Sequence, residues 1–239
     1  MSSVEFNLSK QLNEIAVAIS DNQLEQLIKF IKILLTANQT TNLTAITDFD
    51  EAMVKHIYDS LLIMTIPEFK LANNTIDVGS GGGIPSIPLA ICNPGKKIVS
   101  LEATQKKLNF QLEVGLKLGL KNLVPIWGRA EELAIQKIHR EQYDLVIARA
   151  VAPLNILAEL TIPFVKLQGE AIFYKGKEAE YEIIKGEHAV QTLGAEFYGK
   201  KSFILPCNFG SRVLVSFQKK QITPSIYPRK PGVPQKKPL

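Results

Sequence analysis

Hydrophobic positions in the first 70 residues recur with the spacing of an α-helix. Apolar side chains at 24, 27, 28, 31, 34 and 35 follow the i, i+3, i+4, i+7 rule. Ser20 and Gln23 form a capping box at the start of this helix. A less regular helix is expected at residues 9–19, and another helical face covers residues 53–64 before Pro67. The sequence therefore predicts a helical N-terminal extension over residues 1–70.

From residue 75 the pattern changes to short apolar runs that alternate with longer amphipathic stretches. The apolar runs predict buried strands at residues 75–79, 97–102, 123–127, 143–149 and 170–174. The amphipathic stretches predict helices at residues 85–92, 104–118, 131–138 and 153–165. This alternation is typical of a doubly wound, Rossmann-like α/β fold, in which helices cover both faces of a parallel sheet. Ligands of such folds bind beyond the carboxyl ends of the strands.

The remaining pattern predicts the end of this sheet. A charged helix is expected at residues 178–193, followed by β-rich runs at 202–205 and 212–218 that a short turn separates. We expect these two runs to form a terminal hairpin with one strand antiparallel to the others. The predicted organisation is therefore an extension at 1–70, a ligand-binding domain at 71–218 and a tail at 219–239.

Composition places the chain among ordinary globular proteins, with 239 residues, 46% hydrophobic and 21% charged. Cys92 and Cys207 fit neither a disulfide framework nor a zinc pattern, so we expect a cytoplasmic protein without a structural metal. No stretch reaches the ~18 consecutive apolar residues that a membrane span needs. We therefore expect no membrane association.

Positive charge is concentrated at the end of the chain. The net charge is +5, yet residues 219–239 contain six Lys and Arg and no Asp or Glu, so the rest of the chain is slightly acidic. Five of the 13 prolines also lie there, which predicts an extended surface segment. A basic tail suggests a polyanionic partner such as RNA, with phosphate contacts from Arg229, Lys230, Lys236 and Lys237. A merely solubilising terminus is the alternative.

A glycine-rich loop follows the first predicted strand. Four glycines occur within five residues, at Gly79, Gly81, Gly82 and Gly83, and Pro85 stands at the start of the next helix. Ile84 occupies the third glycine position of the dinucleotide fingerprint, so the spacing is G-x-G-x-G. The chain also lacks the G-x-x-x-x-G-K-[ST] loop that binds nucleoside triphosphates.

An acidic residue ends the next predicted strand. Glu102 lies 23 residues after Gly79 in the sequence. This spacing is typical of the carboxylate that accepts hydrogen bonds from ribose hydroxyls. Together they favour an adenosine-containing ligand, and a G-x-G-x-G loop fits S-adenosylmethionine. The simpler alternative is a tight turn after one strand and a solvated acid after the other.

Two further groups follow the third and fourth predicted strands. Ala130 and Glu131 offer an amide and a carboxylate for the edge of an adenine, although an acidic residue is also common at a helix start. Arg149 ends a buried strand, where a guanidinium can bind a carboxylate or phosphate, or else form an ion pair with Asp77 or Glu102.

Several segments together resemble the RsmG (GidB) family of 16S ribosomal RNA guanine-N7 methyltransferases. The resemblance rests on Asp77-Val-Gly-Ser-Gly-Gly-Gly-Ile-Pro, Arg149-Ala-Val-Ala-Pro-Leu, Lys175-Gly, Asn42-Leu-Thr-Ala-Ile-Thr, His56-Ile-Tyr-Asp-Ser-Leu and the segment from Tyr227 to Leu239. It implies a class I methyltransferase fold, S-adenosylmethionine as cofactor, and 16S rRNA of the small ribosomal subunit as substrate. We separately expect a monomer. By this resemblance the cofactor contacts are Gly79, Ile84, Glu102, Ala103, Thr104, Ala130, Glu131 and Arg149. Members often have Gly where Ser86 stands and Asp where Glu102 stands.

The implied reaction requires no catalytic acid or base. Guanine N7 has a free lone pair at neutral pH, so the enzyme mainly aligns N7 with the methyl carbon. His56 and Asp59, three residues apart on one helical face, are therefore interpreted as packing residues. Two alternatives stay open: a methyltransferase of the same fold acting on a small molecule or protein, and a non-catalytic RNA-binding assembly factor. An NAD-dependent oxidoreductase is disfavoured by Ile84.

Overall fold

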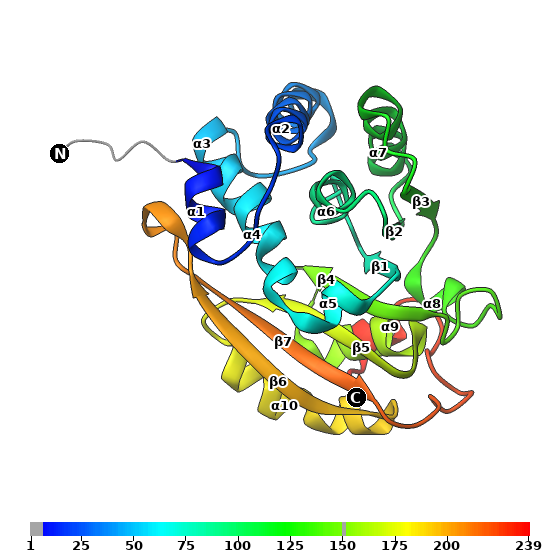
Figure 1. The fold of residues 1–239 in the computed structure, drawn as a ribbon. Helices are drawn as coiled ribbons and strands as arrows, with labels where there is room; N and C mark the ends of the chain where they lie inside the picture. Colours follow the sequence, from blue (N-terminus) through cyan, green and yellow to red (C-terminus); the bar gives the residue numbers. More distant parts are fainter. Residues whose placement is uncertain (1–6, 150–151) are drawn as a thin grey trace.

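A single mixed sheet forms the centre of the protein. The structure is a computed structural model that describes residues 7–149 and 152–239. The strand order is β3-β2-β1-β4-β5-β7-β6 (Figure 1). The strands are β1 (Asn74–Val78), β2 (Lys97–Glu102), β3 (Leu123–Trp127), β4 (Tyr143–Arg149), β5 (Val165–Lys175), β6 (Ala195–Ile204) and β7 (Ser211–Lys219). Strands β1 to β5 pair in parallel, whereas β7 is antiparallel to both β5 and β6. The predicted doubly wound fold with one antiparallel strand is confirmed.

The direction of strand addition changes between β1 and β4, which are neighbours in the sheet. Here the chain leaves for β2 and β3 on one side and later returns for β4 and β5 on the other. Such a switch point opens a crevice at the carboxyl ends of the strands. The glycine loop follows β1 and Arg149 ends β4, so both lie at this edge.

Helices cover both faces of the sheet (Figure 1). Alternating residues of β4 show the two cores, because Leu145 and Ile147 pack with the N-terminal helices while Val146 and Ala148 pack with α9 and α10. The first face carries α1 (Leu8–Glu14), α2 (Asp21–Thr41), α3 (Phe49–Ala52), α4 (Asp59–Leu61), α5 (Pro67–Leu71), α6 (Ser86–Cys92) and α7 (Gln105–Leu118). The second carries α8 (Ala130–Leu133), α9 (Leu154–Thr161) and α10 (Ala179–Thr192).

The N-terminal helices share a core with the sheet. Leu34 of α2 is fully buried and lies in the same hydrophobic cluster as Ile147 of β4. The predicted capping box of α2 is present, with Ser20 and Gln23 bonded in both directions. A π-helical turn, Met53–Tyr58, joins α3 to α4 and places His56 and Asp59 toward the sheet, where both are buried.

Several predicted boundaries were wrong, including the end of the first helix, which was expected at residue 19 and lies at Glu14. The helix predicted at 131–138 is only α8, Ala130–Leu133, and β5 begins at Val165 rather than at 170. Strand β6 begins at Ala195, well before the predicted 202. It is an edge strand whose residues are mostly exposed, so no apolar run marks its first half.

The predicted tail is packed for part of its length. Lys219 is the last residue of β7 and is fully buried. Further on, Pro228 and Pro234 are buried, and a short helix, α11 (Val233–Lys236), packs against α9. The expectation of a segment extended over the surface was therefore wrong for these residues. In the described ranges, no helix has the length and apolar character needed to cross a membrane.

Candidate functional site

The glycine loop presents bare main chain at the switch point. Gly81 has a φ of +58°, and a Cβ built there meets no atom within 4 Å. By contrast, a Cβ at Gly83 would come within 2.3 Å of Ile87, and one at Gly82 within 3.1 Å of Leu34. The loop is therefore packed tightly from behind and open at Gly81. Such an opening lets a ligand approach the backbone directly.

Gln111 holds this loop from the adjacent helix α7. Its Nε2 donates to the carbonyl oxygen of Gly81 at 2.7 Å and to Ser80 Oγ at 2.8 Å. Its Oε1 accepts from Ser100 Oγ of β2 at 2.5 Å, and the side chain is fully buried. We did not single out this residue from the sequence. The available signal was a polar residue on the otherwise apolar face of the predicted helix 104–118.

Glu102 lies at the end of β2, as predicted, and its carboxylate contacts the glycine loop. Its Oε2 accepts from the Gly81 N–H at 2.8 Å, and its Oε1 accepts from the Thr104 N–H at 2.7 Å. The carboxylate is buried. Each oxygen can accept a second hydrogen bond, so the group can still receive two hydroxyls. The structure thus brings together Gly79, Glu102, Ala103 and Thr104, while Ile84 lies behind the loop against the first core.

The residues predicted to bind the adenine edge follow β3, which contacts Ala103. Trp127 ends β3, and its Nε1 donates to the Ala103 carbonyl oxygen at 3.1 Å. Ala130 and Glu131 begin α8 just after it. The Glu131 carboxylate is buried, and its Oε1 accepts from the Gly232 N–H of the C-terminal segment at 3.1 Å.

Arg149 is held by the N-terminal helices rather than by the acids considered in the sequence analysis. Its Nε lies 3.2 Å from Asp59 Oδ2, and its Nη2 donates to the Lys55 carbonyl oxygen at 2.6 Å. The expected alternatives, ion pairs with Asp77 or Glu102, do not form. Burial lowers the pKa of the guanidinium, and Asp59 opposes this. Ala150 and Val151 of the same motif lie outside the described residues.

Asp59 is a buried ionic centre instead of a packing residue. Arg212 at the start of β7 binds it bidentately, with Nε–Oδ1 at 2.7 Å and Nη2–Oδ2 at 2.8 Å. Arg149 contributes a third contact, and Asp59 itself is fully buried. Neither arginine could be paired with Asp59 from the sequence, because Arg149 lies 90 residues and Arg212 lies 153 residues away from it along the chain.

Three buried polar atoms lie near this ionic centre without a partner among the described residues: His56 Nδ1, Asp77 Oδ1 and Arg149 Nη1. The other nitrogen of His56, Nε2, lies 2.7 Å from Thr44 Oγ1, and Asp77 Oδ2 accepts from Ser86 Oγ at 2.5 Å. Burial, with Arg149 nearby, lowers the pKa of His56 to about 4. Burial raises the pKa of Asp77 to about 7, although the Ser86 hydrogen bonds oppose this. Such atoms can serve a polar ligand.

Comparison with known proteins gives the family. The family model described as "rRNA small subunit methyltransferase G" (GidB) matches residues 23–207. A protein of Alkaliphilus metalliredigens named ribosomal RNA small subunit methyltransferase G is 42% identical over 226 residues, covering 95% of both chains. The protein of the same name from Brevibacillus brevis is 40% identical over 223 residues, covering 93% of this chain and 94% of its own.

Solved structures agree on the fold. An O-methyltransferase from Bacillus cereus in complex with SAH has a TM-score of 0.56 at 15% identity, covering 89% of this chain and 97% of its own. A putative sarcosine dimethylglycine methyltransferase from Galdieria sulphuraria has a TM-score of 0.52 at 12% identity, covering 72% and 88%. The family match over most of the chain therefore confirms the resemblance: this protein belongs to the rRNA small subunit methyltransferase G (GidB) family and has the class I methyltransferase fold.

Proposed function

We propose that this protein transfers a methyl group from S-adenosylmethionine to guanine N7 in 16S rRNA of the small ribosomal subunit. The observation that carries the proposal is the meeting of an open main chain at Gly81 with the buried carboxylate of Glu102. This pair suits a nucleoside whose sugar hydroxyls donate to Glu102. Membership of the family supports rRNA as the substrate class.

The charged groups of the cofactor are complementary to two buried side chains, Asp77 and Arg149. S-adenosylmethionine supplies an electrophilic methyl group on a sulfonium and carries an ammonium and a carboxylate at its amino acid end. Asp77 Oδ1 and Arg149 Nη1 have no partner among the described residues and match these two charges. Ala130 and Glu131 would hold the adenine edge, and Glu102 the ribose.

No described side chain needs to move a proton in this reaction. Guanine N7 attacks with its own lone pair, so the protein's contribution is to orient the base and exclude water. His56, with its pKa near 4, is neutral at pH 7 and offers a hydrogen-bonding atom rather than a charge. We propose that it orients the incoming base. We also propose that the protein acts as a monomer in the cytoplasm.

Glu102→Ala tests the cofactor site. The variant should bind S-adenosylhomocysteine at least tenfold more weakly by calorimetry, because two hydrogen bonds to a charged group are lost, each worth roughly 1.5–3 kcal/mol. Glu132→Ala, which removes an exposed carboxylate from α8, should bind like wild type. Equal affinity of Glu102→Ala and wild type would reject this ribose site.

The substrate is tested by methyl transfer. Labelled S-adenosylmethionine is incubated with the protein and either free 16S RNA or 30S particles, and the modified base is mapped. Label at a guanine N7 is expected. Label only in small molecules would favour a methyltransferase of the same fold with a small-molecule substrate. Cofactor binding without transfer would favour a non-catalytic RNA-binding assembly factor. Light scattering of the purified protein should give the mass of one chain.

A further inference from the structure

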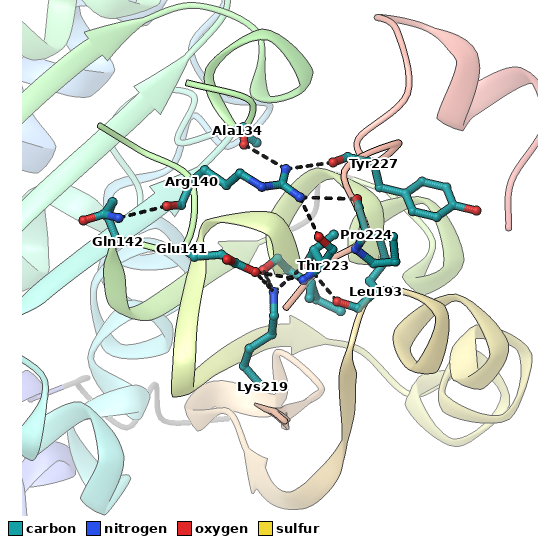
Figure 2. Close-up of polar contacts among 10 residues, drawn as sticks. Ala134, Arg140, Glu141, Gln142, Leu193, Lys219, Thr223, Pro224 and Tyr227 are labelled. Carbon is teal, nitrogen blue, oxygen red and sulfur yellow. Dashed lines mark hydrogen bonds and ion pairs between the residues drawn. The ribbon is translucent and has the colours of Figure 1, made fainter. Parts of the chain in front are cut away.

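Three of the six cations of the C-terminal segment, residues 219–239, form ion pairs within the chain: Lys219, Lys220 and Arg229. Lys219 Nζ lies 3.2 Å from Glu141 Oε1 and donates to Thr223 Oγ1 at 2.5 Å. The Arg140 guanidinium donates to the carbonyl oxygens of Thr223 at 2.7 Å and of Tyr227 at 2.8 Å (Figure 2). The first part of the segment is therefore fixed by a buried lysine on one side and by an arginine on the other.

Arg229 gives the segment its next anchor. Glu159 of α9 is fully buried, and Arg229 donates to it from Nε at 2.9 Å, from Nη2 at 2.6 Å and from its backbone N–H at 2.7 Å. A buried carboxylate that accepts three charge-assisted or backbone hydrogen bonds strongly favours one position of its partner. Arg229 was expected to face RNA phosphates, and this contact corrects that expectation.

Beyond this anchor the chain reaches the cofactor side of the sheet. Gly232 has a φ of +80°, a left-handed conformation that favours glycine, and its N–H points to Glu131 Oε1 at 3.1 Å. Pro234 is buried just after it, and α11 packs against α9, the helix that carries Glu159. The turn at Gly232 is thus fixed on both sides. It delivers one donor to the carboxylate assigned to the adenine edge.

We propose that residues 219–239 form a fixed C-terminal strap that completes the adenine side of the cofactor pocket, and that Gly232 is a positioning residue whose N–H orients the Glu131 carboxylate. This inference rests on the proposed function, since it takes S-adenosylmethionine as the ligand. It gives the strap a role in cofactor recognition that is separate from any contact with RNA. A carboxylate fixed through one oxygen keeps the other directed at one place, where it can accept from the adenine amino group.

The readout is discrimination between two ligands. S-adenosylhomocysteine carries an amino donor at the purine edge, whereas S-inosylhomocysteine carries an oxygen acceptor there and would be repelled by a carboxylate. Calorimetry on the full chain measures both affinities. Wild type is expected to prefer the adenine ligand. Gly232→Ala should reduce this preference roughly three- to tenfold, the loss of about one hydrogen bond, because alanine shifts the left-handed turn and with it the N–H.

Two matched controls isolate the strap. Gly119→Ala makes the same substitution at another positive φ, +64°, with open space around it, at the end of α7 away from Glu131. Arg229→Met loosens the anchor at Glu159, whereas Lys230→Met removes one charge from an exposed position beside it. Gly119→Ala and Lys230→Met should keep the wild-type preference. Arg229→Met should reduce the preference as Gly232→Ala does.

The outcomes separate the two proposals. If wild type prefers the adenine ligand and Gly232→Ala shows the same preference, the strap inference is overturned while the cofactor site stands. A variant that loses affinity for both ligands equally also overturns it, because general loosening would then explain the result. A wild type that binds both ligands equally overturns the assignment of Glu131. If wild type binds neither ligand, the proposed function itself fails.

Discussion

Individual buried charges in this protein are balanced by partners from distant parts of the chain. Asp59, fully buried, lies between the guanidinium groups of Arg149 and Arg212. Removing one member of such a group leaves an uncompensated buried charge, which typically costs about 3–5 kcal/mol. The arrangement fixes Arg149 at the carboxyl end of β4 before any ligand arrives. Asp59 therefore helps to hold Arg149 in place at the end of β4.

His56 should make stability depend on pH. Its pKa is 6.5 in the unfolded chain and about 4 in the fold, so between these values the unfolded state binds more protons. The stability that neutral His56 contributes is present above pH 6.5 and is lost as pH falls toward 4. The stability advantage of wild type over His56→Gln should therefore shrink by about 3 kcal/mol between pH 7 and pH 4.

Comparison with this variant is essential, because Asp77 has the opposite effect. Its pKa rises from 3.8 to about 7 in the fold, so falling pH stabilises the native state over nearly the same range. The two effects partly cancel in wild type. Urea unfolding of both proteins at several pH values gives the difference. A gap that stays constant from pH 7 to pH 4 would show that His56 is not held neutral.

Helices and strands were predictable where their buried residues form a recognisable apolar pattern in the sequence. Strands β1, β2 and β4 are largely buried and read as apolar runs, and the α2 capping box is local, so these elements were placed closely. Edge strand β6 has mostly exposed residues, and its first half was missed.

In the candidate site, Glu102 was found because its spacing from Gly79 is fixed by one strand-helix-strand unit. Gln111 and Arg212 were missed because their partners come together only through tertiary packing.

Helix α2 supports the glycine loop, and Leu34→Ala tests this contact. Leu34 is fully buried, and its Cδ1 lies against Gly82. Removing the side chain should lower the free energy of unfolding by about 2–5 kcal/mol, through lost burial and the cavity left behind. Chemical denaturation measures this loss, and calorimetry should show weaker S-adenosylhomocysteine binding as the loop gains freedom. Leu116→Ala, at a position 85% exposed, should change neither quantity.

Across the whole molecule, the distribution of charge differs from the impression that the sequence gives. Of the six cations in residues 219–239, Lys219, Lys220 and Arg229 lie in ion pairs with Glu141, Glu196 and Glu159. The remaining three are exposed and available to phosphates: Lys230, Lys236 and Lys237. Deleting the entire segment would remove buried anchors as well as these exposed charges. Point substitutions are therefore the informative test of RNA binding.

Replacing the three exposed lysines with glutamine should flatten the salt dependence of RNA binding. Each lost phosphate contact reduces the slope of log K against log salt by about 0.7–0.9, so a total change of about 2–3 is expected if all three contact RNA. Filter binding over a range of salt concentrations measures this slope. A matched triple variant at exposed lysines elsewhere should keep it, at Lys97, Lys121 and Lys185. An unchanged slope in the first variant would place the RNA on another surface.

The hydrogen bond from Gly232 to Glu131 joins residues 101 positions apart, and it has a consequence for how the protein is made. A ribosome translating the message produces the sheet and the glycine loop long before it reaches the codon for Gly232. Until then the nascent chain lacks the donor that fixes Glu131, and it lacks the guanidinium that neutralises Glu159. Products that stop before these residues would carry most of the fold but an unfinished pocket, so premature termination should yield protein that discriminates poorly between adenine and hypoxanthine ligands.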